Sequence, residues 1–197
     1  DYNLDPGLVE AAITSRTRAI MPVHLTGKST DMDGVMSVAR KHNVFVIEDC
    51  AQAVCAEHNG KRVGSFGEVG CFSLHPLKTL NACGDGGVVT TNDENLYQQF
   101  KLLRNHGLRT RDNGMMWAFN SRLDTMQAAV LLTKLDHVED WTEGRRANAA
   151  AYRERLAGLD EVVLPVEEPH QRSVYHTFVI QAERRENLRS FLTDRGV

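Results

Sequence analysis

The chain lacks the features that mark several large classes of protein. No apolar run approaches the roughly 18 residues that a membrane-spanning helix needs, and no secretory signal peptide is visible. None of the four cysteines forms a CxxC pair, and none has zinc-finger spacing to a histidine. The net charge of −3 gives no broad basic footprint for nucleic acid. We therefore expect a cytoplasmic protein with reduced thiols and with no metal, nucleic-acid or membrane partner.

The chain also lacks an initiating methionine. It opens with Asp1-Tyr2-Asn3-Leu4 and ends at Gly196-Val197, directly after an expected helix. Both ends resemble internal segments of a longer protein, so we expect a chain truncated at both ends. The 197 residues suffice for one domain, or for one domain and the start of another. A hydrophobic share of 42% and a charged share of 25% are typical of a globular protein.

The first half of the chain alternates between helical and strand patterns. Helices are expected from Asp5 to Ser15, from Asp31 onward, and from Asn92 to Asn105, with Asp5 and Asp31 as N-caps. Strands are expected at 19–23, 44–47, 69–73 and 86–91. The run Val44–Ile47 is apolar without interruption, which is typical of a parallel strand buried on both faces. This pattern predicts an α/β domain with helices on both faces of a mainly parallel sheet.

The second half is mainly helical. Helices are expected at 123–137, 141–156 and 183–195, with strands at 162–164 and 175–180. We place a boundary near Trp141. Residues 1–140 form part of a large domain, and residues 141–197 begin a smaller α+β domain.

Two side chains follow the buried strand that ends at Ile47. In open α/β sheets, ligands bind beyond the carboxyl ends of the strands, so the carboxylate of Asp49 could pair there with a cationic ring nitrogen. Gln52 could reach the same pocket with a neutral amide. Taken alone, Asp49 could equally be a helix cap or a strand-end ion pair, and Gln52 a surface residue.

A second group of residues follows the strand expected to end near Ser73. Lys78 emerges on the loop after Pro76, at the same expected edge as Asp49. Only six residues are lysine, against seventeen arginines, and only lysine can form an imine. A lone loop lysine is also typical of an exposed charge. Gly84-Asp85-Gly86-Gly87 permits a tight turn but matches neither a dinucleotide nor a P-loop motif.

Together these residues describe one chemistry. A strand-end aspartate can keep the ring nitrogen of pyridoxal 5'-phosphate (PLP) protonated, so that the ring accepts electrons. A loop lysine can hold the same cofactor as a Schiff base and then move protons. The pair Asp49 and Lys78 therefore predicts a PLP enzyme.

Several motifs carry a resemblance to a known family. The chain resembles the DegT/DnrJ/EryC1/StrS family of PLP-dependent sugar aminotransferases, which have the fold-type I, aspartate aminotransferase-like architecture. The matching segments are 22–27 (PVHLTG), 47–53 (IEDCAQA), 64–67 (GSFG), 72–78 (FSLHPLK), 84–87 (GDGG), 103–107 (LRNHG), 120–124 (NSRLD), 127–129 (QAA) and Tyr175-His176.

The resemblance implies a role for each matching residue. Lys78 would form the Schiff base, and Asp49 would bind the pyridine nitrogen. Gln52 would lie near the phenolic oxygen of the ring, and Ser73 would bind the phosphate. Asn120 would reach the cofactor phosphate of a partner subunit, which implies a homodimer with shared active sites. Three further residues would be possible substrate contacts, with packing or surface pairing as the alternative: His24, Arg122 and His176.

The implied activity is transfer of an amino group from an amino acid, glutamate in this family, to a nucleotide-linked keto sugar. The product would be an amino sugar. Some family members carry histidine at the lysine position and dehydrate their substrate, so Lys78 favours transamination. Cys50 and Thr79 occupy positions where alanine and asparagine are frequent in the family. We expect these two differences to affect substrate choice more than mechanism. A sugar dehydratase of the same fold and a non-catalytic sugar-nucleotide binding protein stay as alternatives.

Overall fold

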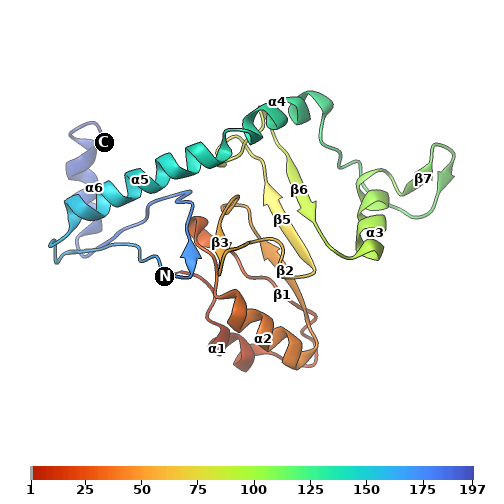
Figure 1. The fold of residues 1–197 in the computed structure, drawn as a ribbon, viewed down its shortest axis with the longest axis horizontal. Helices are drawn as coiled ribbons and strands as arrows, with labels where there is room; N and C mark the ends of the chain where they lie inside the picture. The colour runs from red at the N-terminus through yellow and green to blue at the C-terminus, as the bar shows by residue number, and fades with distance from the viewer. Residues whose placement is uncertain (1) are drawn as a thin grey trace.

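The computed structural model describes residues 2–197 and has a mixed α/β architecture (Figure 1). Its central sheet has the strand order β1-β2-β5-β6. The strands are β1 (Ala19–Ile20), β2 (Phe45–Asp49), β5 (Val69–Ser73) and β6 (Gly87–Thr90). The first three are mutually parallel, and β6 is antiparallel to β5. The prediction of a mainly parallel sheet is confirmed.

Two helices pack beside β1 and β2. They are α1 (Pro6–Ala12) and α2 (Met32–His42), and the side chains of Asp5 and Asp31 cap them as predicted. Helix α1 ends at Ala12 rather than near Ser15, because Ile13 takes an extended backbone with ψ of 133°. The first core cluster lies between these helices and the sheet and contains Ile20, Met32, Val35, Val38, Ala39 and Val46.

A small three-stranded sheet joins distant parts of the chain. Strand β3 (Glu57–His58) pairs with β4 (Lys61–Arg62) and with β10 (Gln171–Arg172), all antiparallel. Just beyond β10, Val174 is fully buried in a second core cluster with Cys50, Ala53, Ala56 and Val63. Residues from the C-terminal part of the chain are thereby held against the segment that follows β2.

The remaining elements extend outward from the sheet (Figure 1). Helix α3 (Glu94–Arg104) leads into an arm with the short strands β7 (Leu108–Thr110) and β8 (Asn113–Gly114). Helices α4 (Thr125–Leu135) and α5 (Val138–Leu156) follow. Strands β9 (Val162–Val163) and β11 (Gln181–Ala182) pair next to α6 (Arg185–Thr193). A one-turn 3₁₀ helix, η1 (Leu25–Gly27), lies after β1.

One predicted strand is wrong. Residues 175–180 form no strand; pairing occurs before them in β10 and after them in β11. Tyr175 has a left-handed backbone with φ of 47°, which interrupts an extended run. Helix α5 begins at Val138, so it passes through the expected boundary at Trp141, and that boundary stays a prediction.

Within residues 2–197, no helix combines the length and apolar character needed to cross a membrane.

Candidate cofactor site

The parallel strands place two predicted site residues at one edge of the sheet. Asp49 is the last residue of β2, and Ser73 is the last residue of β5, two positions beyond the register partner of Asp49. The backbone of Asp49 is tied on both sides, since its N–H donates to Pro22 O at 2.9 Å and its carbonyl accepts from His24 N at 3.0 Å. The half-buried carboxylate accepts from Ala51 N through Oδ1 at 3.0 Å, and within the described chain Oδ2 has no hydrogen bond. That oxygen is open to a cationic N–H.

Gln52 is fixed by the loop after β1. Its Oε1 accepts a hydrogen bond of 2.8 Å from the backbone N–H of Thr26. Thr26 has φ of 60°, a left-handed conformation that costs free energy in a β-branched residue and that is common at functional sites. The side chain of Gln52 is therefore anchored beside Asp49 rather than free on the surface.

Lys78 lies on a tight loop beyond β5. Its N–H donates to His75 O at 2.8 Å, and its carbonyl accepts from Asn81 Nδ2 at 2.8 Å. Leu74 N donates to Gly86 O at 2.8 Å, so the glycine-rich turn closes over the same loop. The Lys78 side chain is half-buried rather than an exposed charge.

His176 joins this group from the other end of the chain. Burial is the main cause that lowers its pKa below the ordinary value of 6.5, and the nearby charges of Lys78 and Arg145 lower it further. Its Nδ1 is buried and has no hydrogen-bond partner among the described residues. Gly27, with φ of 90°, permits the close approach, since a Cβ there would lie 2.9 Å from His176 N and 3.0 Å from Gln52 O. The structure thus brings Asp49, Gln52, Lys78 and His176 to one region.

Asn120 and Arg122 lie between β8 and α4. Both side chains are exposed, and Arg122 Nε donates to Asn120 Oδ1 at 3.1 Å. Asn120 forms an isolated bridge with Asn105 at the base of the arm. Its role toward a partner subunit stays a prediction.

His24 is placed differently from a substrate contact. Its side chain is fully buried, and both ring nitrogens are engaged, with Glu48 Oε2 at 3.2 Å and Thr30 N at 3.1 Å. This position favours a structural role over direct contact with substrate. Glu48 is not among the predicted site residues, although an acid next to Asp49 on a buried strand must face the opposite side of the sheet and so needs internal partners.

The side chains of His24, Glu48 and Cys50 offer ligand atoms within 4.8 Å of one another. Hydrogen bonds account for this cluster. The carboxylate of Glu48 accepts from the backbone N–H groups of Gly64, Phe66 and Gly67 as well as from His24. Burial, followed by the charge of Glu48, raises the pKa of the Cys50 thiol, which opposes the thiolate that a metal requires. The arrangement favours a hydrogen-bonded network over a metal centre.

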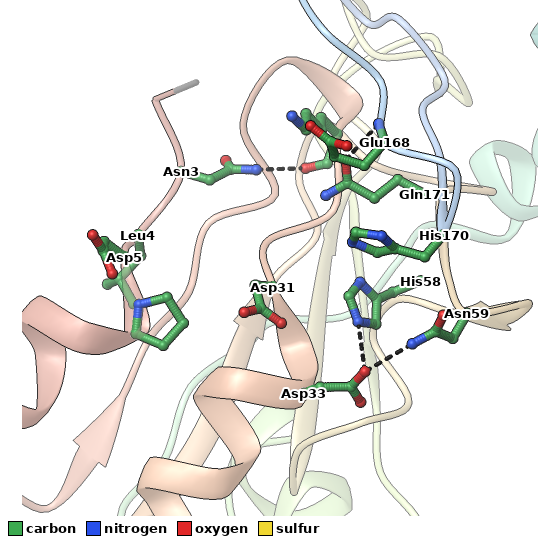
Figure 2. A pocket seen from close by; sticks show the side chains of 12 residues that line it. Asn3, Leu4, Asp5, Asp31, Asp33, His58, Asn59, Glu168, His170 and Gln171 are labelled. Carbon is green, nitrogen blue, oxygen red and sulfur yellow. Dashed lines mark hydrogen bonds and ion pairs between the residues drawn. The ribbon is translucent and has the colours of Figure 1, made fainter.

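A separate cavity of about 560 Å³ lies between the start of α2 and the segment before β10 (Figure 2). Four carboxylates and one lysine, Lys28, are among its lining residues. The acids are Asp5, Asp31, Asp33 and Glu168. None of the residues predicted to hold the cofactor lines it, and its excess of acid does not suit a phosphate group. The strand edge, not this cavity, fits the cofactor.

The residues at the strand edge do fit PLP. Asp49 Oδ2 is open to a protonated ring nitrogen, Lys78 supplies a half-buried amine, and His176 Nδ1 is an orphaned polar atom beside it. The Thr79 hydroxyl, directly after the lysine, is also buried and without a hydrogen bond inside the described chain. Buried polar atoms without partners indicate a polar group that completes the site.

Comparison with known proteins identifies the family of the chain. The DegT/DnrJ/EryC1/StrS aminotransferase family matches residues 1–197. A dTDP-3-amino-3,4,6-trideoxy-alpha-D-glucose transaminase of Streptomyces venezuelae is 46% identical over 98% of this chain and 51% of its own. A UDP-N-acetyl-3-dehydro-alpha-D-glucosamine 3-aminotransferase of Acidithiobacillus ferrooxidans is 47% identical over 96% of this chain and 51% of its own.

Solved structures agree as well. The crystal structure of S. venezuelae DesV in complex with a ketimine intermediate superposes with a TM-score of 0.96 at 47% identity, covering 98% of this chain and 52% of that one. The chain spans about half the length of the curated relatives it matches. Sequence and fold agree throughout that span, and the chain belongs to the DegT/DnrJ/EryC1/StrS aminotransferase family.

Proposed function

We propose that the whole protein is a PLP-dependent sugar aminotransferase. It would move an amino group from an amino acid, glutamate by family resemblance, to a keto sugar linked to a nucleoside diphosphate. Relatives that are named as transaminases of dTDP- and UDP-linked sugars support this substrate class. The observation that carries the proposal is the meeting of Lys78 and His176 at the sheet edge where Asp49 ends β2.

Each residue of the site has a separate task. When bound, PLP supplies an aldehyde that joins amines and a ring that accepts an electron pair. Asp49 Oδ2 would hold the ring nitrogen in its protonated form, and Gln52 would lie near the phenolic oxygen. Ser73 would donate its hydroxyl to the phosphate. The amine of Lys78, once released from the aldehyde carbon, would take the proton from the donor's α-carbon and deliver it to that former aldehyde carbon.

The state of His176 suits this proton transfer. Because its pKa is lowered, the imidazole is neutral at pH 7 and adds no positive charge beside the Lys78 amine. Its orphaned Nδ1 is then available to a hydroxyl or amine of the substrate. This supports the assignment of His176 as a substrate contact.

A homodimer is part of the proposal. The arm between α3 and α4 projects from the body and carries Trp117, which is 100% exposed (Figure 1). Met115, Met116 and Phe119 beside it are also exposed. An apolar group of this kind, next to Asn120, is typical of a protein interface. We propose that a second copy covers the arm and that Asn120 reaches the phosphate in that copy's site.

The four cysteines are free thiols, which supports a cytoplasmic protein.

The test uses full-length protein incubated with PLP. Covalent attachment should give the visible absorption of a PLP–lysine adduct, and borohydride reduction followed by peptide mass spectrometry should find the cofactor on Lys78. The variant K78A should lose both signals, whereas K101A, which removes an exposed lysine of α3, should keep them. Cofactor trapped on another lysine would reject the assignment. Turnover of keto sugar that needs no amino donor would favour the dehydratase instead.

A further inference from the structure

We propose that Glu48 and His24 are positioning residues for the cofactor site. From the interior side of the sheet they fix the two loops that border Asp49, one of which carries the anchor of Gln52. This inference rests on the proposed function, since it concerns the same site. Neither residue is a proposed contact of the cofactor, so both would act through other residues.

Glu48 and Asp49 are consecutive residues of β2. Consecutive residues of a strand face opposite sides, so Asp49 faces the site while Glu48 faces the interior, where it is fully buried. Its Oε1 accepts from Phe66 N at 2.7 Å and from Gly67 N at 2.9 Å. Its Oε2 accepts from Gly64 N at 2.7 Å. These three bonds tie the 64–67 turn to the strand end.

The fourth bond runs to the opposite loop. His24 Nδ1 accepts from the backbone N–H of Thr30 at 3.1 Å, so this nitrogen carries no proton. The ring hydrogen is therefore on Nε2, which donates to Glu48 Oε2 at 3.2 Å. A neutral imidazole thus connects a buried carboxylate to both ends of the 24–30 loop.

That loop holds two residues of the site. Thr26 N donates to Gln52 Oε1 at 2.8 Å, and Gly27 packs against the backbone of His176. The strained φ of 60° at Thr26 persists only if the surrounding contacts impose it. The contacts that hold the two ends of the loop, His24 with Glu48 and Thr30 with His24, supply that constraint. Glu48 consequently reaches Gln52 through His24 and Thr26.

The substitution E48Q tests this path. A glutamine offers one acceptor oxygen in place of two, so at least one backbone N–H or the His24 N–H loses its partner. The matched control is E68Q. Glu68 Oε2 accepts from Val46 N at 2.6 Å, near the beginning of the same strand and away from Asp49. Both substitutions replace a carboxylate that accepts backbone N–H groups, Glu48 from within β2 and Glu68 from the turn before β5. Only E48Q acts on the loops of the site.

The measurement is the dissociation constant for PLP in full-length protein, at a temperature where every variant is folded. We expect E48Q to weaken binding about tenfold or more, and E68Q to leave it within about twofold of wild type. A double-mutant cycle with Q52A supplies a readout that a merely structural role would not move. If Glu48 acts through Gln52, the double variant binds PLP more tightly than the product of the two single effects predicts.

Two results would overturn the inference. One is equal PLP affinity in E48Q and E68Q, and the other is strictly multiplicative effects in the double-mutant cycle. Should E48Q fail to fold, H24N replaces it, because asparagine keeps an acceptor for Thr30 N but is too short to reach Glu48. Unchanged PLP binding by a folded H24N also overturns the inference. Failure of the wild-type protein itself to bind PLP rejects the proposed function instead, so the two failures are distinguishable.

Discussion

Gln52 Oε1 accepts a hydrogen bond of 2.8 Å from the backbone N–H of Thr26, which lies 26 positions earlier in the sequence. This bond joins the loop after β1 to the segment after β2 at the place where the cofactor ring is proposed to lie. Thr26 is held in a left-handed conformation. Within the described structure, its N–H has no hydrogen-bond acceptor other than Gln52.

Removal of the Gln52 amide should therefore loosen the site. We expect Q52A to weaken PLP binding by about two- to twelvefold, the range that one net hydrogen bond of about 0.5–1.5 kcal/mol allows. Titration of the cofactor absorption measures the change. Q98A, which removes an exposed glutamine bonded only to Glu94 in α3, should bind PLP like wild type. Equal affinity of Q52A and Q98A would show that Gln52 has no part in cofactor binding.

Gly27 should tolerate no side chain. An alanine Cβ would lie 2.7 Å from Val174 Cγ2 and 2.9 Å from His176 N, at a residue with φ of 90°. We expect G27A to lower the free energy of unfolding by about 2 kcal/mol or more. It should also reduce PLP binding, because the Cβ would lie 3.0 Å from Gln52 O and displace the segment that carries Gln52. Denaturant unfolding measures the first effect.

The matched substitution is G60A. Gly60 has φ of 72°, but a Cβ there meets nothing within 4 Å. It should cost only the backbone penalty, about 1 kcal/mol, and leave PLP binding unchanged. If G27A and G60A destabilise equally, the close approach of His176 is not the reason for the glycine at position 27.

His176 should make stability depend on pH. The folded pKa lies below the ordinary 6.5, so as the pH falls below about 6.5 the unfolded chain takes up a proton before the folded one does. The stability that His176 contributes is present above that pH and is lost as the pH falls toward the lowered folded value. Thermal unfolding from pH 7 to pH 5 should therefore show a smaller loss for H176Q than for wild type. Parallel curves for the two proteins would contradict the burial of this group.

Trp117 should govern self-association. Replacement of this fully exposed side chain by aspartate places a charge in the proposed interface. We expect W117D to weaken the dimer about thirtyfold or more, equivalent to about 2 kcal/mol at an aromatic anchor. Sedimentation of the full-length protein over a range of concentrations measures this. V166D, at an exposed apolar residue away from the arm, should sediment like wild type. A dimer unaffected by W117D would exclude the arm from the interface.

Local rules explain most of what the sequence predicts correctly. Asp5 and Asp31 cap helices because their side chains accept N–H groups only two or three positions away. The uninterrupted run before Asp49 correctly predicts a parallel strand. The strand is not buried on both faces along its whole length, since Phe45 is 63% exposed. The position of Asp49 at a strand end then follows from the sheet alone.

Long-range packing explains what the sequence does not predict. The left-handed Tyr175 breaks an extended pattern that propensity alone favours, since its carbonyl and that of His176 accept from Arg145 in α5. The partners of Glu48 come from segments 24 residues before it and 16 to 19 residues after it. No short sequence window contains them, so an acid beside the cofactor aspartate is easily overlooked.

Helix α5 has a mechanical consequence. Its 19 residues form a rod about 28 Å long, and Arg145, within that rod, donates to the carbonyls of Tyr175 and His176 at 3.4 Å. A tilt of the rod about its sheet-side end would carry the imidazole with it and change its separation from the reactive amine.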